Sequence, residues 1–374
     1  MLWERETFVV DPRPSYHYRV SGNRYTPSHK TASTILNPSL SLVFLHAAGM
    51  FKECFEPVIE LLFQKKRAYG GVNIGEIWAI GMTTFLYADH ADPFSECPNH
   101  GQSAVLNAKD IARDYQGEWS LTEYCDAVSA FLRGQPGGHD LLQKELVFIG
   151  QSVGAITISL LSARDPAIRF HSIILGDPIL GPRSTAKDMI AVSYSRSSFV
   201  RQDVWPSRDE ARGYLDEYSL TKAWKPESKD LFVKYALMDH SAGSLPKPFD
   251  FRGVTLACRR DQEAACYRAI AMDSEAHRLL ARLYSSNIPV YYIYDLKPNQ
   301  RAAQIQPGIF LCEGTMPTAT YGIRAGHLAS VIQGFSMVRL ILLQFVQNDP
   351  GETATALAHI LKDDNSKRAY LARL

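Results

Sequence analysis

One serine has the surroundings of a nucleophile. Residues 150–154 read Gly-Gln-Ser-Val-Gly, so Ser152 stands at the centre of a G-x-S-x-G pattern. The apolar run 145–149 before it predicts a buried strand, and the run 155–163 after it predicts a helix. A sharp turn between strand and helix exposes a serine hydroxyl, and flanking glycines avoid collisions in that turn. The pattern predicts that Ser152 attacks a carbonyl carbon.

A nucleophilic serine needs a base and an acid, which in this arrangement follow it in the order acid, then histidine. His327 follows the last predicted strand, at 319–323, and is the favoured base. Asp177 and Asp295 each come at the end of an earlier predicted strand, and either could orient the imidazole. From spacing alone the two aspartates are equal candidates.

The expected reaction also needs donors for a developing oxyanion. Two backbone N–H groups usually serve, one after the nucleophile and one in the loop after an earlier strand. Val153 fills the first position. The buried strand predicted at 41–45 ends in His-Ala-Ala-Gly at 46–49, and Ala48 is the expected second donor.

Strand and helix patterns alternate along most of the chain, which predicts a mostly parallel sheet with helices on both faces. Residues 1–40 hold short strand-like pieces that suit an antiparallel edge. The alternation stops between 181 and 285, a charged and largely helical stretch that we interpret as an inserted cap. We therefore expect a catalytic core formed by 1–180 and 286–374. Its predicted strands lie at 41–45, 76–80, 145–150, 172–176, 288–294 and 319–323, with helices at 53–64, 121–133, 155–163 and 330–347.

The composition excludes several classes of protein. The 374 residues include 40 basic and 39 acidic side chains, a net charge of +1, which gives no bulk attraction to nucleic acid. The chain contains no run of about 18 apolar residues, so no transmembrane helix is predicted. Acidic residues near the start are unlike a secretory signal. Six scattered cysteines form no C-x-x-C pair, so we expect reduced, mostly buried thiols and neither a metal nor a redox cofactor.

Several segments resemble a fungal peroxisomal α/β-hydrolase group that includes a lipase, an acyl-CoA hydrolase of mycophenolic acid biosynthesis and toxin-biosynthesis hydrolases. The resemblance covers most of the chain and is weakest in 215–285. The segments that carry it are LVFLHAAGMFKECFEPVIELL at 42–62, NHGQSAVLN at 99–107, GQSVG at 150–154, GDPIL at 176–180 and RQDVWPSRDEA at 201–211.

The resemblance implies the α/β-hydrolase fold, with cap helices that shape a tunnel for an acyl group. It favours Asp177 as the catalytic acid, because the acid of the acyl-CoA hydrolase follows the strand after the nucleophile helix. Ala47 stands where the group usually has glycine; its methyl group is expected to be tolerated at the substrate, although it could narrow the oxyanion loop. Trp205, one of several aromatic residues of the cap, is expected to contact a hydrophobic acyl chain. Such residues would equally be found in the hydrophobic core of any cap.

The last three residues, Ala372, Arg373 and Leu374, fit the small–basic–leucine form of a peroxisomal address, which an import receptor reads. Together these features predict a peroxisomal serine hydrolase that cleaves a thioester or ester of a hydrophobic acyl group, with an acyl-CoA preferred. A lipase or carboxylesterase is the alternative, and a non-catalytic binding protein is a further one. An epoxide hydrolase is disfavoured, because that chemistry on this fold generally uses an aspartate where Ser152 stands.

Overall fold

The computed structural model describes residues 2–28, 39–69, 73–81, 120–164, 168–298, 302–324 and 345–371, together with residues 107, 110, 113, 117 and 118. His327, the tripeptide 372–374 and most of the helix expected at 330–347 lie outside the described residues.

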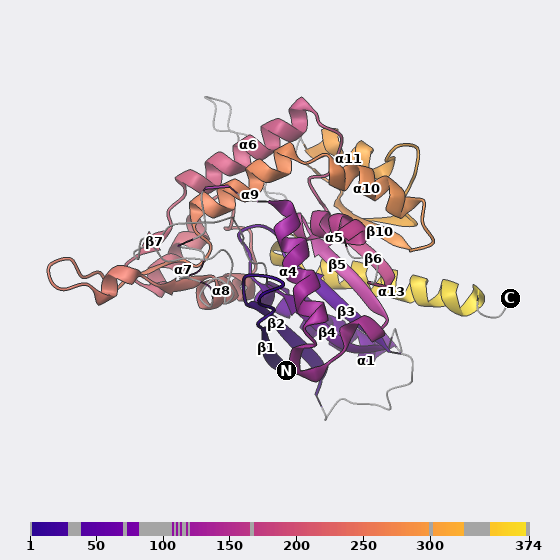
Figure 1. Cartoon of the computed structure of the whole chain (residues 1–374), viewed down its shortest axis with the longest axis horizontal. Helices are drawn as coiled ribbons and strands as arrows, with labels where there is room; N and C mark the ends of the chain where they lie inside the picture. Colours follow the sequence, from indigo (N-terminus) through magenta and orange to yellow (C-terminus); the bar gives the residue numbers. More distant parts are fainter. Residues whose placement is uncertain are drawn as a thin grey trace.

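An eight-stranded sheet forms the centre of the molecule, in the order β1-β2-β4-β3-β5-β6-β10-β11 (Figure 1). β2 pairs antiparallel with β1 and with β4, and all the other neighbours are parallel. This confirms the predicted parallel sheet with an antiparallel edge. The strands are β1 (Trp3–Val10), β2 (Val20–Pro27), β3 (Leu40–Leu45), β4 (Ile74–Ile80), β5 (Leu146–Gln151), β6 (Phe170–Gly176), β10 (Val290–Asp295) and β11 (Ala319–Ile323).

Helices cover both faces of the sheet, because successive strand residues point to opposite sides and both sides are apolar. Val43 and Phe148 enter one core cluster, whereas Leu42 and Val147 enter the other. The first cluster is closed by α4 (Leu121–Arg133), α5 (Val153–Arg164) and α10 (Glu275–Tyr284), and the second by α1 (Glu56–Tyr69) and α13 (Pro350–Leu371). Shorter helices are η1 (Lys52–Phe55), η2 (Pro136–Gly138), η3 (Leu141–Gln143), α11 (Ala302–Phe310) and α12 (Phe345–Asn348).

The stretch between β6 and β10 forms an extension beside the sheet (Figure 1). The sequence indicates only helices here, but the structure adds a small antiparallel sheet in the order β7-β9-β8. α10 packs on α5 and so covers the main sheet, and the boundary of the cap at 285 stays a prediction. The elements of the predicted cap are α6 (Thr185–Val200), β7 (Val204–Trp205), α7 (Arg208–Glu217), α8 (Pro226–Tyr235), β8 (Leu237–Asp239), η4 (Ser241–Ser244), β9 (Val254–Leu256) and α9 (Arg260–Met272).

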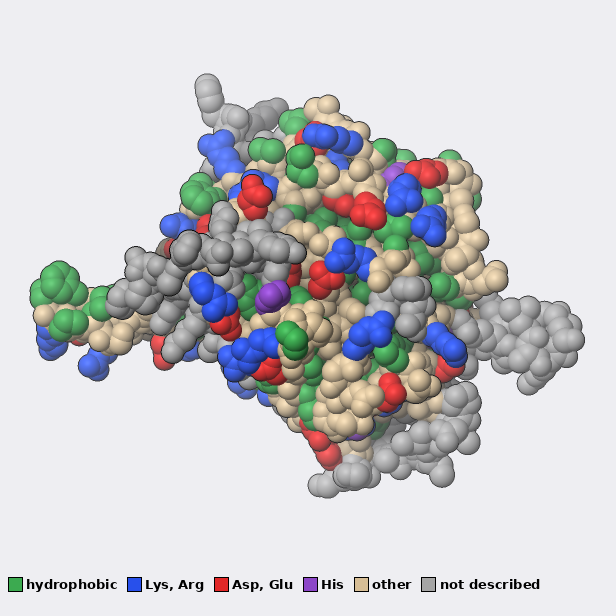
Figure 2. All heavy atoms as spheres, in the orientation of Figure 1, with side chains coloured by type: hydrophobic (Ala, Val, Ile, Leu, Met, Phe, Trp, Pro, Cys, Tyr) green, Lys and Arg blue, Asp and Glu red, His purple; other side chains and the backbone are tan. Residues whose placement is uncertain are grey.

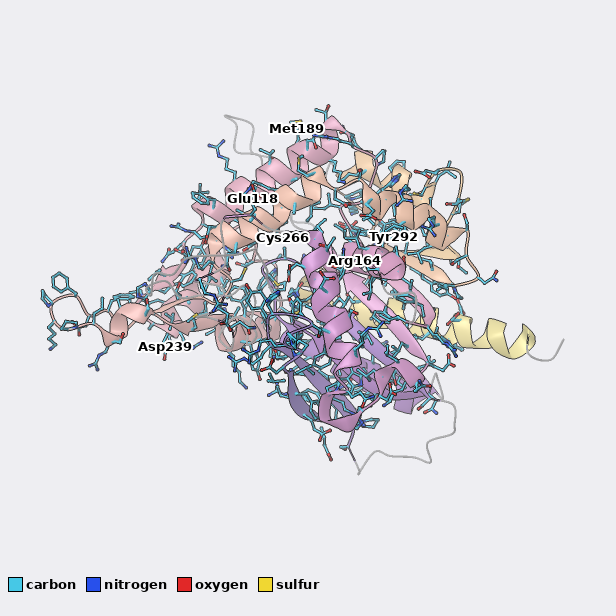
Figure 3. The ribbon with its side chains drawn as sticks, in the orientation of Figure 1. Glu118, Arg164, Met189, Asp239, Cys266 and Tyr292 are labelled. Carbon is cyan, nitrogen blue, oxygen red and sulfur yellow. The ribbon has the colours of Figure 1, made fainter. Side chains whose placement is uncertain are left out.

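The surface mixes both signs of charge over the face shown in Figure 2. Apolar side chains gather at the tip between β8 and β9, where Leu245 and Phe249 are exposed. Met189 and Asp239 also point away from the body, whereas Cys266 and Tyr292 lie inside it (Figure 3). Within the described residues, no helix is both long and apolar enough to span a bilayer.

The predicted state of the cysteines is confirmed for the five that the structure describes. Each of them is buried and forms no disulfide bond, and Cys97 lies outside the described residues. Burial raises the pKa of these thiols, which disfavours the reactive thiolate. These cysteines act as small apolar core residues. They are Cys54, Cys125, Cys258, Cys266 and Cys312.

Candidate active site

Ser152 occupies a strained turn between β5, which ends at Gln151, and α5, which begins at Val153. Its φ of 53° lies in the left-handed region, where a residue other than glycine is uncommon. The Ser152 N–H donates to the carbonyl oxygen of Gly176 at 2.8 Å, and its carbonyl accepts from the Ala155 N–H at 3.0 Å. These bonds hold the residue in a conformation that costs of order 1–3 kcal/mol, as is common at functional sites.

The two glycines of the motif are required by packing. A β-carbon on Gly150 would lie 2.5 Å from the backbone nitrogen of Ala155. One on Gly154 would lie 2.2 Å from the carbonyl oxygen of Leu45. Both distances are shorter than any real contact of a β-carbon, so a side chain at either position would force the turn apart. The predicted reason for the two glycines is confirmed.

The loop 46–49 lies directly beside this turn. β3 and β5 are neighbours, with Leu45 paired to Gly150, so the two strands deliver the loop and the turn to the same edge of the sheet. Ala48 and Val153, the two expected oxyanion donors, are therefore in segments that touch, and both residues are buried. Gly49 ends the loop with a φ of 73°, a conformation that glycine adopts at little cost.

His46 is a structural part of this loop. Its N–H donates to the Tyr124 hydroxyl at 3.0 Å, and that hydroxyl donates to the Ile80 carbonyl at 3.2 Å. The Nδ1 atom lies 2.9 Å from the Ala47 carbonyl oxygen. In the neutral tautomer with its proton on Nδ1, the ring donates a hydrogen bond to that oxygen. Complete burial lowers the pKa of His46 to about 4, although the bond to Ala47 acts in the opposite direction. His46 is thus uncharged at neutral pH and ties the loop to β4 and α4.

Asp177 follows β6 at a second strained position, with a φ of 42°. Its N–H donates to the Ile293 carbonyl at 3.0 Å, and its carboxylate accepts from the Tyr292 hydroxyl at 3.4 Å. Because Gln151 pairs with Gly176 in the sheet, the next residues, Ser152 and Asp177, start side by side at the edge. Burial and then the Asp177 charge raise the pKa of Tyr292, which keeps that hydroxyl a donor.

Asp295 is the last residue of β10, one strand further along the same edge. It is buried, and its Oδ1 atom accepts from the Lys297 N–H at 2.9 Å. It pairs with Ile323 of β11, four positions before His327 in the chain. The structure thus brings Ser152 and both candidate acids to one edge, and the choice between the acids stays a prediction because His327 lies outside the described residues.

A buried ion pair that the sequence analysis does not predict joins the cap to the loop 46–49. Arg201, after α6, pairs with Glu263 of α9, which also accepts from the Ser198 hydroxyl at 3.0 Å. The Glu263 carboxyl carbon lies 2.8 Å from the place of a β-carbon on Gly49. Arg201 and Glu263 are 62 positions apart, so local spacing cannot reveal the pair. Arg201 does open the segment 201–211, which carries the family resemblance.

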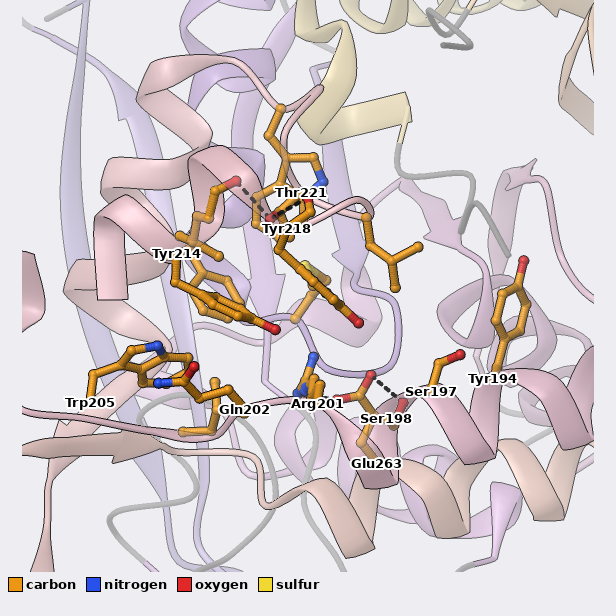
Figure 4. Close-up of a pocket in the computed structure, with 16 residues that line it drawn as sticks. Tyr194, Ser197, Ser198, Arg201, Gln202, Trp205, Tyr214, Tyr218, Thr221 and Glu263 are labelled. Atoms are coloured by element: carbon orange, nitrogen blue, oxygen red, sulfur yellow. Dashed lines mark hydrogen bonds and ion pairs between the residues drawn. The ribbon is translucent and has the colours of Figure 1, made fainter. Parts of the chain in front are cut away.

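A cavity lies in the cap beside this ion pair (Figure 4). Trp205 lines it, and Met50 borders it from the end of the loop. The expected contact of Trp205 with substrate stays a prediction. Ala47 is buried in the loop and is not part of the cavity wall. The free space is about 30 Å³, enough for roughly one or two water-sized groups. Further wall residues include Tyr214, Tyr218, Trp224 and Phe232.

Comparison with solved structures decides the fold. Over 96% of this chain and 88% of the other, the structure matches the peroxisomal alpha-beta-hydrolase Lpx1 from Saccharomyces cerevisiae with a TM-score of 0.65 and 17% sequence identity. The chain has the α/β-hydrolase fold. The chain also matches the thioesterase domain from the curacin biosynthetic pathway, with a TM-score of 0.55 and 11% identity over 96% of this chain and 99% of that one.

Among curated proteins, the chain is similar to the type I acyl-CoA thioesterase mpaH of Penicillium brevicompactum. The two are 25% identical over 232 residues, which is 62% of this chain and 46% of the relative. A second thioesterase of the same fungus, mpaH', is 24% identical over the same extent. The match thus spans about half the length of the curated relatives. No family model matches the chain. These matches agree with the fungal group that the sequence segments resemble.

Proposed function

We propose that this α/β-hydrolase cleaves a thioester or ester of a hydrophobic acyl group, with an acyl-CoA as the preferred class of substrate. The main support for the proposal is the conformation and place of Ser152. It has a positive φ and lies between β5 and α5, beside the loop 46–49. The similarity to the acyl-CoA thioesterase mpaH supports the thioester. The apolar cap cavity supports a hydrophobic acyl group.

In the proposed reaction, His327 takes the proton of Ser152 while the serine oxygen attacks the carbonyl carbon. The N–H groups of Ala48 and Val153 bind the oxyanion, and the N-terminus of α5 favours its negative charge. Asp177 orients His327 and stabilises its charged form. The carbon–sulfur or carbon–oxygen bond then breaks, His327 gives its proton to the leaving thiol or alcohol, and a water molecule hydrolyses the acyl-enzyme.

The test compares hydrolysis of octanoyl-CoA and of p-nitrophenyl octanoate by wild type, Ser152→Ala and Ser162→Ala. Ser162 is a matched control, because it lies in α5 and its hydroxyl donates to the Ser159 carbonyl at 2.7 Å. We expect Ser152→Ala to lose about 10⁴-fold or more of kcat, and Ser162→Ala to keep it. Faster turnover of the p-nitrophenyl ester alone would favour the lipase or carboxylesterase. Absence of turnover with both would favour a binding protein.

A peroxisomal location is part of the proposal. The structural match to a peroxisomal hydrolase supports it, and residues 372–374 carry the predicted address. A fluorescent protein fused before residue 1 should be imported into peroxisomes, whereas fusion after Leu374 should leave it in the cytosol. Import that persists with Leu374 covered would contradict the assignment of the address to Ala372, Arg373 and Leu374.

A further inference from the structure

Two buried donors of the cap cavity lack an acceptor among the described residues. They are the Nε–H of Arg201 and the indole N–H of Trp205, and both side chains form part of the cavity wall. A buried donor without an acceptor costs about 1–3 kcal/mol. Because two such donors belong to the wall of one small cavity, the cavity suits a ligand atom that accepts hydrogen bonds from both.

Much of the remaining cavity wall is aromatic, although Ser197, Gln202 and Thr221 also line it. The rings of Trp205 and Tyr214 lie 5.5 Å apart, and Tyr214 stacks on Tyr218 at 5.0 Å. Figure 4 shows both tyrosines extending toward Arg201, so that the aromatic rings and the side chains of Arg201 and Trp205 border the same space. An apolar wall with a few placed polar groups is the usual form of a small-molecule site.

The charge of the site selects the kind of acceptor. Glu263 already neutralises Arg201, and its carboxylate also borders the cavity. A carboxylate on the ligand would meet the negative charge of Glu263 in a buried place, which is unfavourable. An uncharged oxygen, such as a hydroxyl or a carbonyl oxygen, accepts from Arg201 and Trp205 without that penalty. With about 30 Å³ of free space, the cavity takes the end of a chain and not the whole chain.

The cavity is within reach of the reacting carbonyl. Glu263 touches Gly49, the residue after the expected oxyanion donor Ala48, and Met50 forms part of the cavity wall. By covalent geometry the guanidinium of Arg201 then lies roughly 10 Å from the Ala48 N–H. An acyl group with its carbonyl at that donor reaches the cavity with atoms several bonds from the scissile carbon.

We propose that Arg201 and Trp205 select acyl groups that carry an uncharged oxygen at the end remote from the scissile carbonyl. The inference rests on the proposed hydrolase function and specifies its substrate class as oxygenated acyl esters or thioesters. Plain fatty acyl groups leave the two donors without an acceptor and are poorer substrates.

The experiment measures binding by calorimetry to Ser152→Ala protein, which blocks turnover. The probes are hexanoic, octanoic and decanoic acids and their terminal-hydroxy derivatives. For at least one length, we expect the hydroxy acid to bind about 10-fold more tightly than the plain acid. Adding Trp205→Phe or Arg201→Lys should reduce that ratio toward one. Arg201→Lys keeps the charge beside Glu263 but loses the Nε donor.

Trp3→Phe, added to the same protein, is the matched control. Trp3 of β1 also has a buried indole N–H without an acceptor in the described part of the chain, but it lies outside the cap. It should leave the ratio unchanged. Equal binding of plain and hydroxy acids at every length, or a preference that survives both cap variants, would overturn the proposal. Binding is measured without turnover. A wild-type protein that hydrolyses no ester would therefore contradict the proposed function, but it would leave the preference for hydroxy acids untouched.

Discussion

The carbonyl oxygen of Leu45 lies 2.2 Å from the position that a β-carbon on Gly154 would occupy. The start of α5 thus packs directly against the end of β3. This packing fixes the position of Ser152 relative to the loop 46–49. Gly154→Ala is expected to lower the free energy of unfolding by about 3 kcal/mol, because one methyl group must push two backbone segments apart. Urea unfolding monitored by circular dichroism measures this loss.

Gly213→Ala is the matched control for that substitution. Gly213 lies within α7, and a β-carbon there meets no atom within 4 Å. Alanine in a helix is favoured over glycine, so this variant should be as stable as wild type or up to about 1 kcal/mol more stable. A Gly154→Ala protein that matches Gly213→Ala in stability would show that the two segments are not in contact.

The contact between Glu263 and Gly49 predicts that the cap holds the loop 46–49, with the expected oxyanion donor Ala48, in place. Gly49→Ala places a methyl group within 2.8 Å of the Glu263 carboxyl and should displace the neighbouring Ala48 N–H. Loss of one oxyanion donor costs about 10²–10³ in rate, so we expect kcat to fall by at least 10-fold.

Gly314→Ala separates this effect from backbone strain. Gly314 also has a positive φ, of 82°, but a β-carbon there has no neighbour within 4 Å. Both variants pay a similar cost in stability for the left-handed conformation, and only Gly49→Ala should lose activity in steady-state assays. A similar loss of kcat in both would show that strain, and not the loop, is responsible.

The two aspartates at the edge of the sheet predict different outcomes for one pair of substitutions. If Asp177 orients His327, Asp177→Asn should lower kcat by about 10⁴-fold, as the loss of this carboxylate does in a serine triad. Asp295→Asn should then keep most activity, since the Oδ1 atom that bonds Lys297 survives in the amide. The reverse result in steady-state assays would assign the role to Asp295.

Burial of His46 predicts a loss of stability in acid. The folded protein keeps this imidazole neutral down to a pKa of about 4, whereas an exposed histidine binds a proton near 6.5. Between these values the unfolded chain binds more protons, so the contribution of His46 is complete above pH 6.5 and is lost as the pH falls toward 4.

From pH 7 to pH 5 the free energy of unfolding of wild type should therefore fall by about 2 kcal/mol more than that of His46→Gln. Urea unfolding of both proteins at the two pH values measures the difference. Parallel pH profiles would mean that His46 is accessible to protons in the folded state.

The centre of the sheet could be predicted because its strands are mostly buried and read as nearly continuous apolar runs, namely β3, β4, β5, β6 and β10. β11 was predicted at its observed bounds, as was α4, whose apolar residues repeat at helical spacing. The strands of the cap were not predicted, because β7 has two residues and β8 and β9 have three each. Runs that short carry no alternation from which a strand can be recognised.

Part of the candidate site could be predicted from local sequence, and part depends on contacts that only the fold creates. Ser152 could be predicted because its turn requires a local pattern, with glycines two positions before and after. The link from Arg201 through Glu263 to Gly49 depends on three segments that only the folded chain brings together. The resemblance favoured Asp177, and the structure adds that it has a positive φ and a bond from Tyr292.

A fluorophosphonate probe followed by peptide mass spectrometry tests the nucleophile most directly. We expect one covalent adduct, on the hydroxyl of Ser152, in wild type and in Ser162→Ala but not in Ser152→Ala. An adduct on another residue, or a wild-type protein that stays unlabelled while a known serine hydrolase in the same tube reacts, would contradict this expectation.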